Sequence, residues 1–338
     1  MSKSVAIVGS ESLLGRELRE VLSDKWANQT VTLIGAEETG GILTQDAEAA
    51  AFIAPLEREH LMDAGLAFMA GPGAATWKVL DLLSDTGRTP ALVDLSFALE
   101  DRPEARLRAP MIEPGGYDVA ATAIHVIAHP AAITIALFLD RLHGIEPVAR
   151  SVIQIFEPAS ERGRRGLDEL HQQTVNLFSF KPMPKEVFDA QLGFNMLPRY
   201  GTEAAEKLQD VEVRIDRHLA TLLGIASHAP LPSLRLVQAP VFHGYSISAW
   251  VEFATPPSIA RFRDALASPR VEVRDDGLEP PSNVGAAGQS GITLGAIEAD
   301  RNNPRACWFW VVADNLRISA ENAVMVAKDL LARGGGSQ

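Results

Sequence analysis

Short apolar runs alternate with amphipathic stretches along the first 130 residues. Apolar runs of this length predict buried β-strands, and apolar positions spaced three and four apart predict helices. The predicted strands cover residues 4–8, 30–35, 66–70 and 91–95, and the predicted helices cover residues 13–23 and 74–83. Strands that alternate with helices are typical of a doubly wound parallel sheet, whose ligands lie at the carboxyl ends of the strands.

The stretch from Val126 to Leu137, VIAHPAAITIAL, separates this pattern from a different one. It opens as a strand and turns into a helix at His129-Pro130. Beyond residue 149 the predicted strands cover residues 152–156, 237–242, 247–253 and 308–312, the predicted helices cover residues 164–178, 208–223 and 319–331, and residues 278–285 are a predicted loop. Alternation of apolar and polar residues over 247–253 indicates a half-buried antiparallel strand. The second part is therefore predicted to be an α+β domain.

Composition excludes several classes of protein. The chain has 338 residues, of which 46% are hydrophobic and 22% charged, which predicts a globular protein of two domains. A formal charge of −12 disfavours nucleic-acid binding, which depends on neutralising phosphates. No apolar run reaches the length of a membrane span, and the N-terminus leads directly into a predicted strand. We therefore expect a cytoplasmic protein with no membrane segment.

The first strand-to-helix turn is the first candidate site. It consists of Gly9, Ser10, Glu11, Ser12, Leu13, Leu14 and Gly15. A glycine-rich turn at a helix start can bind a pyrophosphate through backbone N–H groups. Here Ser12 replaces the middle glycine, and Glu11 adds a negative charge. At an effective dielectric constant of about 20, like charges about 4 Å apart repel by roughly 4 kcal/mol. The turn is therefore either a dinucleotide site or a turn kept for folding, with weak affinity.

The turn after the second predicted strand carries Glu37 and Glu38. Two carboxylates oppose the 2′-phosphate of NADP but can accept hydrogen bonds from the ribose hydroxyls of NAD. A solvated acidic turn is the alternative interpretation. If a nicotinamide cofactor binds, the sequence favours NAD over NADP.

Other reactive side chains carry weaker signals. His125, His129 and His243 can lie near a central cleft, as catalytic or as hydrogen-bonded structural residues, and their spacing predicts no metal site. The single cysteine, Cys307, excludes an internal disulfide and is predicted to be a buried, unreactive thiol. The run from Glu157 to Gly166 is a predicted loop into a helix, either an anion site or a solvated helix start.

Eight short motifs occur in order along nearly the whole chain. They are Gly9…Gly15, Phe68-Met69-Ala70-Gly71, Asp94-Leu95-Ser96, Ile127-Ala128-His129-Pro130, Gly163 to Thr174, Phe194-Asn195-Met196-Leu197-Pro198, Ala239 to Ser246 and Val312-Ala313-Asp314-Asn315-Leu316-Arg317. In this order they resemble the aspartate-semialdehyde dehydrogenase family. Members of that family reduce aspartyl phosphate to aspartate semialdehyde with NADPH in amino-acid biosynthesis, through a cysteine thioester.

The resemblance implies an architecture similar to that of glyceraldehyde-3-phosphate dehydrogenase. It implies a dinucleotide-binding Rossmann domain over residues 1–128, a substrate and dimerisation domain over residues 129–312, and a C-terminal helix, residues 313–333, that returns to the first domain. It also implies a homodimer.

Matched position by position, the reactive residues of the family are replaced. The nucleophile matches Ala132, the catalytic base Tyr245, the carboxylate-binding arginine Gln238, the phosphate-binding arginine Glu100 and the positioning glutamine Glu157. The basic substrate contact is retained as Arg214. The cofactor contacts match the turn from Gly9 to Gly15, in which Ser12 takes a phosphate-contact position, together with Glu38, Gly71 and Asn315.

This pattern resembles the cysteine-less Usg-type branch of the family. We therefore expect a non-catalytic homologue with weakened NAD(P) binding, either as a homodimer or as a mixed dimer with an active relative. The alternative is an NAD-dependent oxidoreductase with a changed substrate and no covalent step. In that case Tyr245 serves as the acid beside His129 or His243, and Gly9, Gly15 and Asn315 hold NAD.

Overall fold

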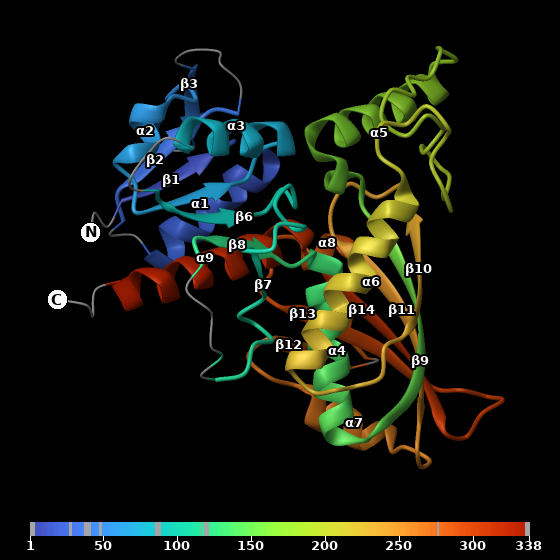
Figure 1. Cartoon of the computed structure of the whole chain (residues 1–338). Coiled ribbons are helices and arrows are strands. Elements are labelled where there is room, and N and C mark those ends of the chain that lie inside the picture. Colours follow the sequence, from blue (N-terminus) through green and yellow to red (C-terminus); the bar gives the residue numbers. More distant parts are fainter. Residues whose placement is uncertain are drawn as a thin grey trace. The chain divides into compact units, whose positions relative to one another are not determined.

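The computed structural model describes residues 4–26, 29–36, 42–46, 49–84, 89–115, 117, 122–275 and 277–334 (Figure 1). The chain divides into two compact units. The first comprises Met1–Pro110, Gly115–Ala128 and Ser319–Gln338, and the second comprises Met111–Pro114 and His129–Ile318. None of the helices in the described part of the chain combines the length and apolar character that a membrane span requires.

The first unit contains a six-stranded, all-parallel sheet with the strand order β2-β1-β5-β6-β8-β7. Its strands are β1 (Val5–Val8), β2 (Val31–Ile34), β5 (Leu66–Met69), β6 (Ala91–Asp94), β7 (Arg106–Arg108) and β8 (Ile124–Ile127). Every residue of β1, β5 and β8 is buried, as expected for parallel strands covered on both faces. A hairpin of β3 (Ile42–Asp46) and β4 (Ala49–Ile53) forms a separate two-stranded sheet.

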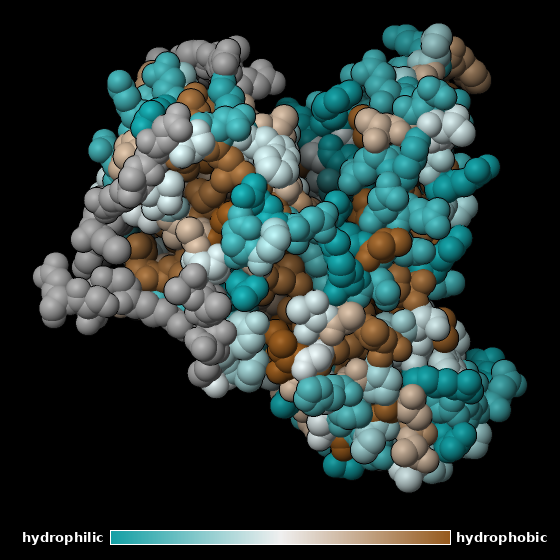
Figure 2. Space-filling view, in the orientation of Figure 1, coloured by the Kyte–Doolittle hydropathy of each residue, from teal (hydrophilic) through white to brown (hydrophobic). Residues whose placement is uncertain are grey.

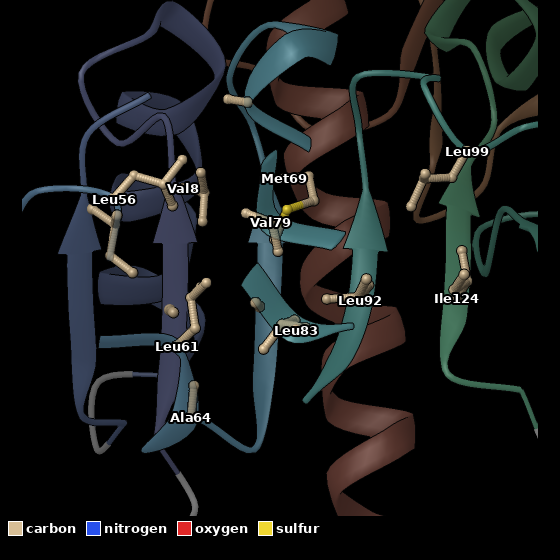
Figure 3. Close-up of a cluster of buried hydrophobic side chains, with 14 of the residues drawn as sticks. Val8, Leu56, Leu61, Ala64, Met69, Val79, Leu83, Leu92, Leu99 and Ile124 are labelled. Carbon is tan, nitrogen blue, oxygen red and sulfur yellow. The ribbon is translucent and has the colours of Figure 1, made fainter. Parts of the chain in front are cut away.

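Helices α1 (Leu13–Trp26), α2 (Arg58–Met62) and α3 (Gly73–Leu83) connect these strands. Figure 3 shows the apolar cluster in which Val8 and Met69 from the strands pack with Val79 and Leu83 of α3. The last helix, α9 (Asn315–Gly334), begins in the second unit and belongs to the first from Ser319 onward. The predicted return of the C-terminal helix to the first domain is thus confirmed.

The second unit is built on a mixed six-stranded sheet with the order β10-β9-β11-β14-β13-β12. Its strands are β9 (Val148–Glu157), β10 (Ser233–Gln238), β11 (Tyr245–Phe253), β12 (Val271–Val273), β13 (Ile292–Ala299) and β14 (Ala306–Ala313). Its helices are α4 (Pro130–Ile145), α5 (Gly163–Phe178), α6 (Leu208–Ile225), α7 (Ile259–Leu266) and α8 (Asn283–Ala286), with a 3₁₀ turn η1 (Ala159–Arg162) before α5. The predicted pairing of an α/β sheet domain with an α+β domain is therefore confirmed.

One face of this second sheet is partly exposed and apolar. Trp250 of β11 pairs with Val152 of β9 on one side and with Trp308 of β14 on the other. Val152 is 49% exposed and Trp308 is 44% exposed. A second pair of exposed apolar side chains lies at the end of α5, where Phe178 packs edge-on against Phe194. Figure 2 shows brown apolar residues distributed among teal polar ones over the visible face.

Two predicted segments differ from the structure. The strand predicted over residues 237–242 is instead β10, which ends at Gln238. The strand cannot continue through Pro240, because proline has no N–H to donate to a sheet. The loop predicted over residues 278–285 contains the start of α8, where the Ser282 hydroxyl accepts a hydrogen bond of 3.2 Å from the Gly285 N–H and caps the helix.

Candidate functional site

Three strand ends in the second unit bring polar side chains into one row. Glu157 is the last residue of β9 and pairs with Gln238, the last residue of β10. On its other side, the pairing of Phe156 with Ser246 places Tyr245, the first residue of β11, next to Glu157. All three side chains are completely buried. The sheet thus aligns an amide, a carboxyl group and a phenol, each of which requires polar partners in the interior.

Arg162 supplies a positive charge beside these three buried side chains. Its Nη2 donates to the Glu157 carboxylate, its Nε donates to the Tyr200 hydroxyl at 3.0 Å, and its Nη1 lies 2.8 Å from Glu206 Oε2. The Tyr200 hydroxyl donates to Gln238 Oε1 at 2.6 Å, and Gln238 Nε2 donates to the Glu157 carbonyl oxygen at 2.8 Å. Each guanidinium nitrogen is therefore engaged by a group of the protein itself, which leaves Arg162 poorly placed to hold an external anion.

Burial controls the ionisation of this network. It raises the pKa of Glu157 to about 7, although the Arg162 guanidinium opposes the rise. It also raises the pKa of Glu161, and it raises the pKa of Tyr245 well above the ordinary value, with further contributions from the Glu161 and Glu157 carboxylates. Burial lowers the pKa of Arg162, but Glu157, Tyr200 and Glu206 together outweigh it, so that pKa lies well above its usual range. Tyr245 therefore stays protonated at neutral pH.

A second polar group adjoins Tyr245. The Glu161 carboxylate accepts a hydrogen bond of 2.7 Å from Asn315 Nδ2, and its other oxygen lies 3.8 Å from His129 Nε2. The rings of His129 and Tyr245 have centroids 6.3 Å apart. Burial, followed by the charges of His218, Arg214 and Arg162, lowers the pKa of His129 well below its ordinary value. The imidazole is therefore neutral at physiological pH.

Helix α4 places Ala132 next to this group. His129 caps the helix, since its Nδ1 accepts a hydrogen bond of 3.3 Å from the Ala131 N–H, and Pro130 occupies the first turn. Ala132 lies in that first turn and is completely buried. A methyl group at this position can neither attack a carbonyl nor exchange a proton.

The structure does not bring every predicted site residue into this cluster. Arg214 lies on α6, with Nη1 3.7 Å from Glu206 Oε1. Glu100 follows β6 in the first unit. His125 is buried in β8 of the first unit, and His243 lies half-buried between β10 and β11. Cys307 is buried on β14, opposite Val251 and six residues along β11 from Tyr245, a separation of about 20 Å at about 3.3 Å per residue.

The first strand-to-helix turn of the first unit is held by glycine packing. Gly9 has a φ of +80°, and a side-chain carbon there would lie 2.4 Å from the Cα of Gly71. A side-chain carbon on Gly15 would lie 2.2 Å from the Gly9 carbonyl oxygen. The Ser12 hydroxyl accepts from the Gly15 N–H and donates to the Ala70 carbonyl oxygen, each at 2.8 Å. Close packing therefore requires glycine at positions 9 and 15.

Glu11 extends from the same turn toward the end of β2. Its carboxylate accepts a hydrogen bond of 2.8 Å from the Ala36 N–H. Ser10 is buried, and Leu13 and Leu14 begin α1. Glu38 lies outside the described residues. The Glu11 carboxylate thus accepts the hydrogen bond of a backbone N–H group just after β2. This is close to the place where a Rossmann sheet binds the adenosine half of a dinucleotide.

Three residues of the cluster carry no signal in the sequence, namely Tyr200, Glu206 and His218. Glu161 and Arg162 lie in the run from Glu157 to Gly166, which the sequence marks as either an anion site or a solvated helix start. Glu161 and Arg162 end the 3₁₀ turn η1 soon after β9, and two adjacent charges close to a buried strand are a usable signal, because buried charges require internal partners. In the described residues, no three His, Cys, Asp or Glu side chains come together as metal ligands would.

The chain is similar to known proteins in both sequence and structure. A family described as semialdehyde dehydrogenase, dimerisation domain, matches residues 139–318. The USG-1 protein homolog of Pseudomonas aeruginosa is 27% identical over 334 residues, and the alignment covers 97% of both chains. The aspartate-semialdehyde dehydrogenase of Synechocystis is 25% identical over 337 residues, with 98% of both chains covered.

A solved structure extends the match to three dimensions. The structure of a probable aspartate-semialdehyde dehydrogenase from Pseudomonas aeruginosa is 26% identical, covers 98% of this chain and 99% of its own, and has a TM-score of 0.84. Because the dimerisation-domain match spans more than half of the sequence, the chain belongs to the semialdehyde dehydrogenase family.

Proposed function

We propose that this chain is a semialdehyde dehydrogenase homologue that does not catalyse the reduction of aspartyl phosphate and instead binds a small molecule or a partner subunit. One observation carries the proposal. The family position of the thiolate nucleophile is Ala132, buried in the first turn of α4. The family reaction forms a thioester before hydride transfer, and covalent capture requires a nucleophile.

Within the described residues, neither Cys307 nor Tyr245 supplies the missing step. Cys307 is buried about 20 Å along the sheet, and burial raises its pKa to about 11, so the thiolate is scarce at neutral pH. At the family position of the catalytic base, the raised pKa of Tyr245 keeps its proton in place. A phenol that stays protonated cannot accept a proton from an attacking group.

The groups that would clamp anionic substrates are also altered. Gln238 stands at the position of the carboxylate-binding arginine, and its amide is used by Glu157, Ala239 and Tyr200. Glu100 stands at the position of the phosphate-binding arginine. Arg162 offers a cation nearby, but its N–H groups are engaged by Glu157, Tyr200 and Glu206. Neutral or negative groups in place of both arginines disfavour a substrate that carries a carboxylate and an acyl phosphate.

Cofactor binding is proposed to be weak, with NAD preferred over NADP. Glu11 brings a negative charge to the turn that would hold the pyrophosphate, and its carboxylate is bound to the Ala36 N–H. A phosphate group there meets like-charge repulsion. The Gly9, Gly15 and Gly71 packing supports the turn whether or not a nucleotide binds.

A homodimer is proposed to form through the apolar face of the second sheet. A mixed dimer of this chain and an active relative is proposed as a further form. The face carries Val152, Trp250 and Trp308 on three adjacent strands. Partly exposed tryptophans on neighbouring strands are typical of interfaces, where they contribute much of the binding energy. An inactive partner in a mixed dimer would alter the assembly without adding a second active site.

The deciding experiment measures the family reaction in reverse. Purified protein is mixed with aspartate semialdehyde, phosphate and NADP⁺, and the absorbance of NADPH is followed, with the Synechocystis relative as the positive control. We expect the rate of the no-enzyme control. Turnover well above that rate, and abolished by a substitution in the Glu157 network, would overturn the proposal.

A second candidate function is an NAD-dependent oxidoreductase without a covalent intermediate. The observation in its favour is that Tyr245 holds a proton beside the neutral imidazole of His129, 6.3 Å away between ring centroids. A phenol in this state can donate a proton to a carbonyl that receives a hydride. Tight NADH binding together with carbonyl turnover that is lost in Tyr245→Phe would support this function, and absence of cofactor binding near millimolar concentration would exclude it.

A further inference from the structure

The carboxyl group of Glu161 is surrounded by hydrogen-bond donors. Asn315 Nδ2 donates to Oε1 at 2.7 Å, and His129 Nε2 lies 3.8 Å from Oε2. The Tyr245 hydroxyl is close enough to Glu161 for each group to shift the pKa of the other. The Glu161 side chain is only 11% exposed, so these groups replace most of the water that would solvate it.

The orientation of Asn315 is fixed independently of Glu161. Its Oδ1 accepts a hydrogen bond of 3.0 Å from the Gly244 N–H, whereas the Ser160 hydroxyl lies 3.2 Å from Oδ1 and 3.1 Å from Nδ2. An amide whose oxygen is held in this way must direct its NH₂ group the other way. The donor that faces Glu161 is therefore in place whether or not a carboxylate is present.

The orientation of His129 is fixed in the same manner. Nδ1 accepts from the Ala131 N–H at 3.3 Å, so the proton of the neutral ring resides on Nε2, the atom that faces Glu161. The His129 backbone N–H donates to His218 Nδ1 at 3.0 Å, which holds the start of α4 against α6. Two directed N–H donors thus converge on one point inside the second unit.

Tyr245 supplies a third donor to the same carboxyl group. The residue is completely buried. A hydrogen bond between its hydroxyl and the Glu161 carboxylate lowers the pKa of Glu161 and raises that of Tyr245. The carboxylate is therefore the partner of a buried hydroxyl, and a buried hydroxyl that loses its partner favours a water molecule or a ligand in its place.

We propose that His129, Tyr245 and Asn315 form a binding site for a small monocarboxylate, and that Glu161 occupies this site as a tethered ligand. This site gives the class of small molecule that the proposed function leaves open. It rests on the proposed function in one respect, namely that the site binds a ligand without reacting with it. A free carboxylate must compete with Glu161, whose tether gives it a high effective concentration. The wild-type protein is therefore expected to bind such a ligand weakly.

Chemical rescue tests this site directly. Glu161→Ala removes the tethered carboxylate, and Glu161→Gln keeps the volume but adds an NH₂ group that opposes the donors. Thermal unfolding is measured for both variants and for the wild type in sodium formate and in sodium chloride of equal ionic strength. We expect formate to raise the unfolding temperature of Glu161→Ala by at least about 2 °C relative to chloride. Glu161→Gln and the wild type are expected to show no difference between the salts.

A second series of variants tests whether Tyr245 and Asn315 are needed for the effect of formate. Adding Tyr245→Phe or Asn315→Ala to Glu161→Ala is expected to reduce the effect of formate at least severalfold. If Glu161→Ala does not fold in chloride, its refolding yield is measured as a function of formate concentration, and the yield is expected to rise with formate alone. Equal responses in formate and chloride, or equal stabilisation of all variants, would refute the site. The rescue requires no turnover, so its outcome is independent of the dehydrogenase assay.

Discussion

The Glu11 carboxylate accepts a hydrogen bond of 2.8 Å from the Ala36 N–H, which ties the turn after β1 to the end of β2. In a dinucleotide-binding sheet these two turns contact the pyrophosphate and the adenosine ribose. A side chain that bridges them competes with both parts of the cofactor.

The first prediction concerns this bridge. The wild-type protein is expected to bind NADPH more weakly than about 1 mM, and Glu11→Ala is expected to bind NADH and NADPH at least tenfold more tightly. Removing a charge near a phosphate is worth up to roughly 4 kcal/mol at about 4 Å. Isothermal titration calorimetry measures the affinities. Glu59→Ala removes the same charge from the exposed face of α2 and is the matched control. Unchanged affinity in Glu11→Ala would contradict the bridge.

Restoring the nucleophile alone is not expected to restore the family reaction. Ala132→Cys places a thiol in the first turn of α4, but Tyr245 cannot act as the base, a loss of about 10²–10⁴-fold. The reverse reaction of Ala132→Cys is expected to stay at the rate of the no-enzyme control, with the Synechocystis relative assayed alongside. A rate within tenfold of that relative would show that the altered base and anion groups matter little.

The Arg162 network predicts a large effect on stability. Arg162→Ala removes the buried partner of Glu157 and leaves carboxyl and hydroxyl groups unmatched, which typically costs about 3–5 kcal/mol. Arg164→Ala removes an exposed arginine paired with Asp168 at 3.8 Å, and a change of less than about 1 kcal/mol is expected. Urea unfolding monitored by circular dichroism compares the two. Similar midpoints for both variants would contradict the internal role of Arg162.

Glu157 predicts a pH dependence of stability with a definite sign. Its pKa of about 7 in the folded protein lies above the ordinary value of 4.5, so between these two values the folded state binds the proton more tightly. The contribution of Glu157 to stability is therefore greatest below pH 4.5 and decreases as the pH rises to about 7, by about 1.4 kcal/mol per pH unit. Glu157→Gln is expected to lack this decrease. Unfolding free energies of both proteins are measured from pH 5 to 7.5, and parallel profiles would disprove the assignment.

The proposed dimer interface predicts a change of assembly state. Trp308→Glu places a charge on the exposed apolar face of the second sheet, and the dimer is expected to dissociate at micromolar concentration with unchanged circular dichroism. Phe180, which is 98% exposed beyond the end of α5, supplies the control variant Phe180→Ser. Size-exclusion chromatography with light scattering gives the masses. A Trp308→Glu variant that remains dimeric would place the interface elsewhere.

The sequence pattern predicted most of the fold for identifiable reasons. The strand β1, Val5–Val8, and the helix that follows are recognisable because the strand is continuously apolar and Leu18, Val21 and Leu22 recur at helical spacing. The error at residues 237–242 arose because the apolar residues Val241 and Phe242 follow Pro240, which ends the strand. The short helix α8 was missed although Ser282 is a typical helix cap.

The site was less predictable, because its partners are distant in sequence. Glu157 and Gln238 are marked by the family resemblance, but Arg162 reaches Glu206, 44 residues later, and Tyr200. Whether the loop after β9 holds an external anion or an internal one depends on those distant partners. No local pattern reveals that Arg162 is engaged within the protein.

Helix α9 starts in one compact unit and continues in the other, and this connectivity constrains the order in which the units can fold during synthesis. The second unit consists almost entirely of the continuous stretch His129–Ile318, so it can fold once that stretch has left the ribosome. The first unit requires Ala323, Val324 and Ala327, which are buried and are translated after the whole of the second unit. Its N-terminal sheet must therefore wait, with part of its apolar core unfilled, until the second unit has been synthesised. In the nascent chain, the unit that begins first is completed last.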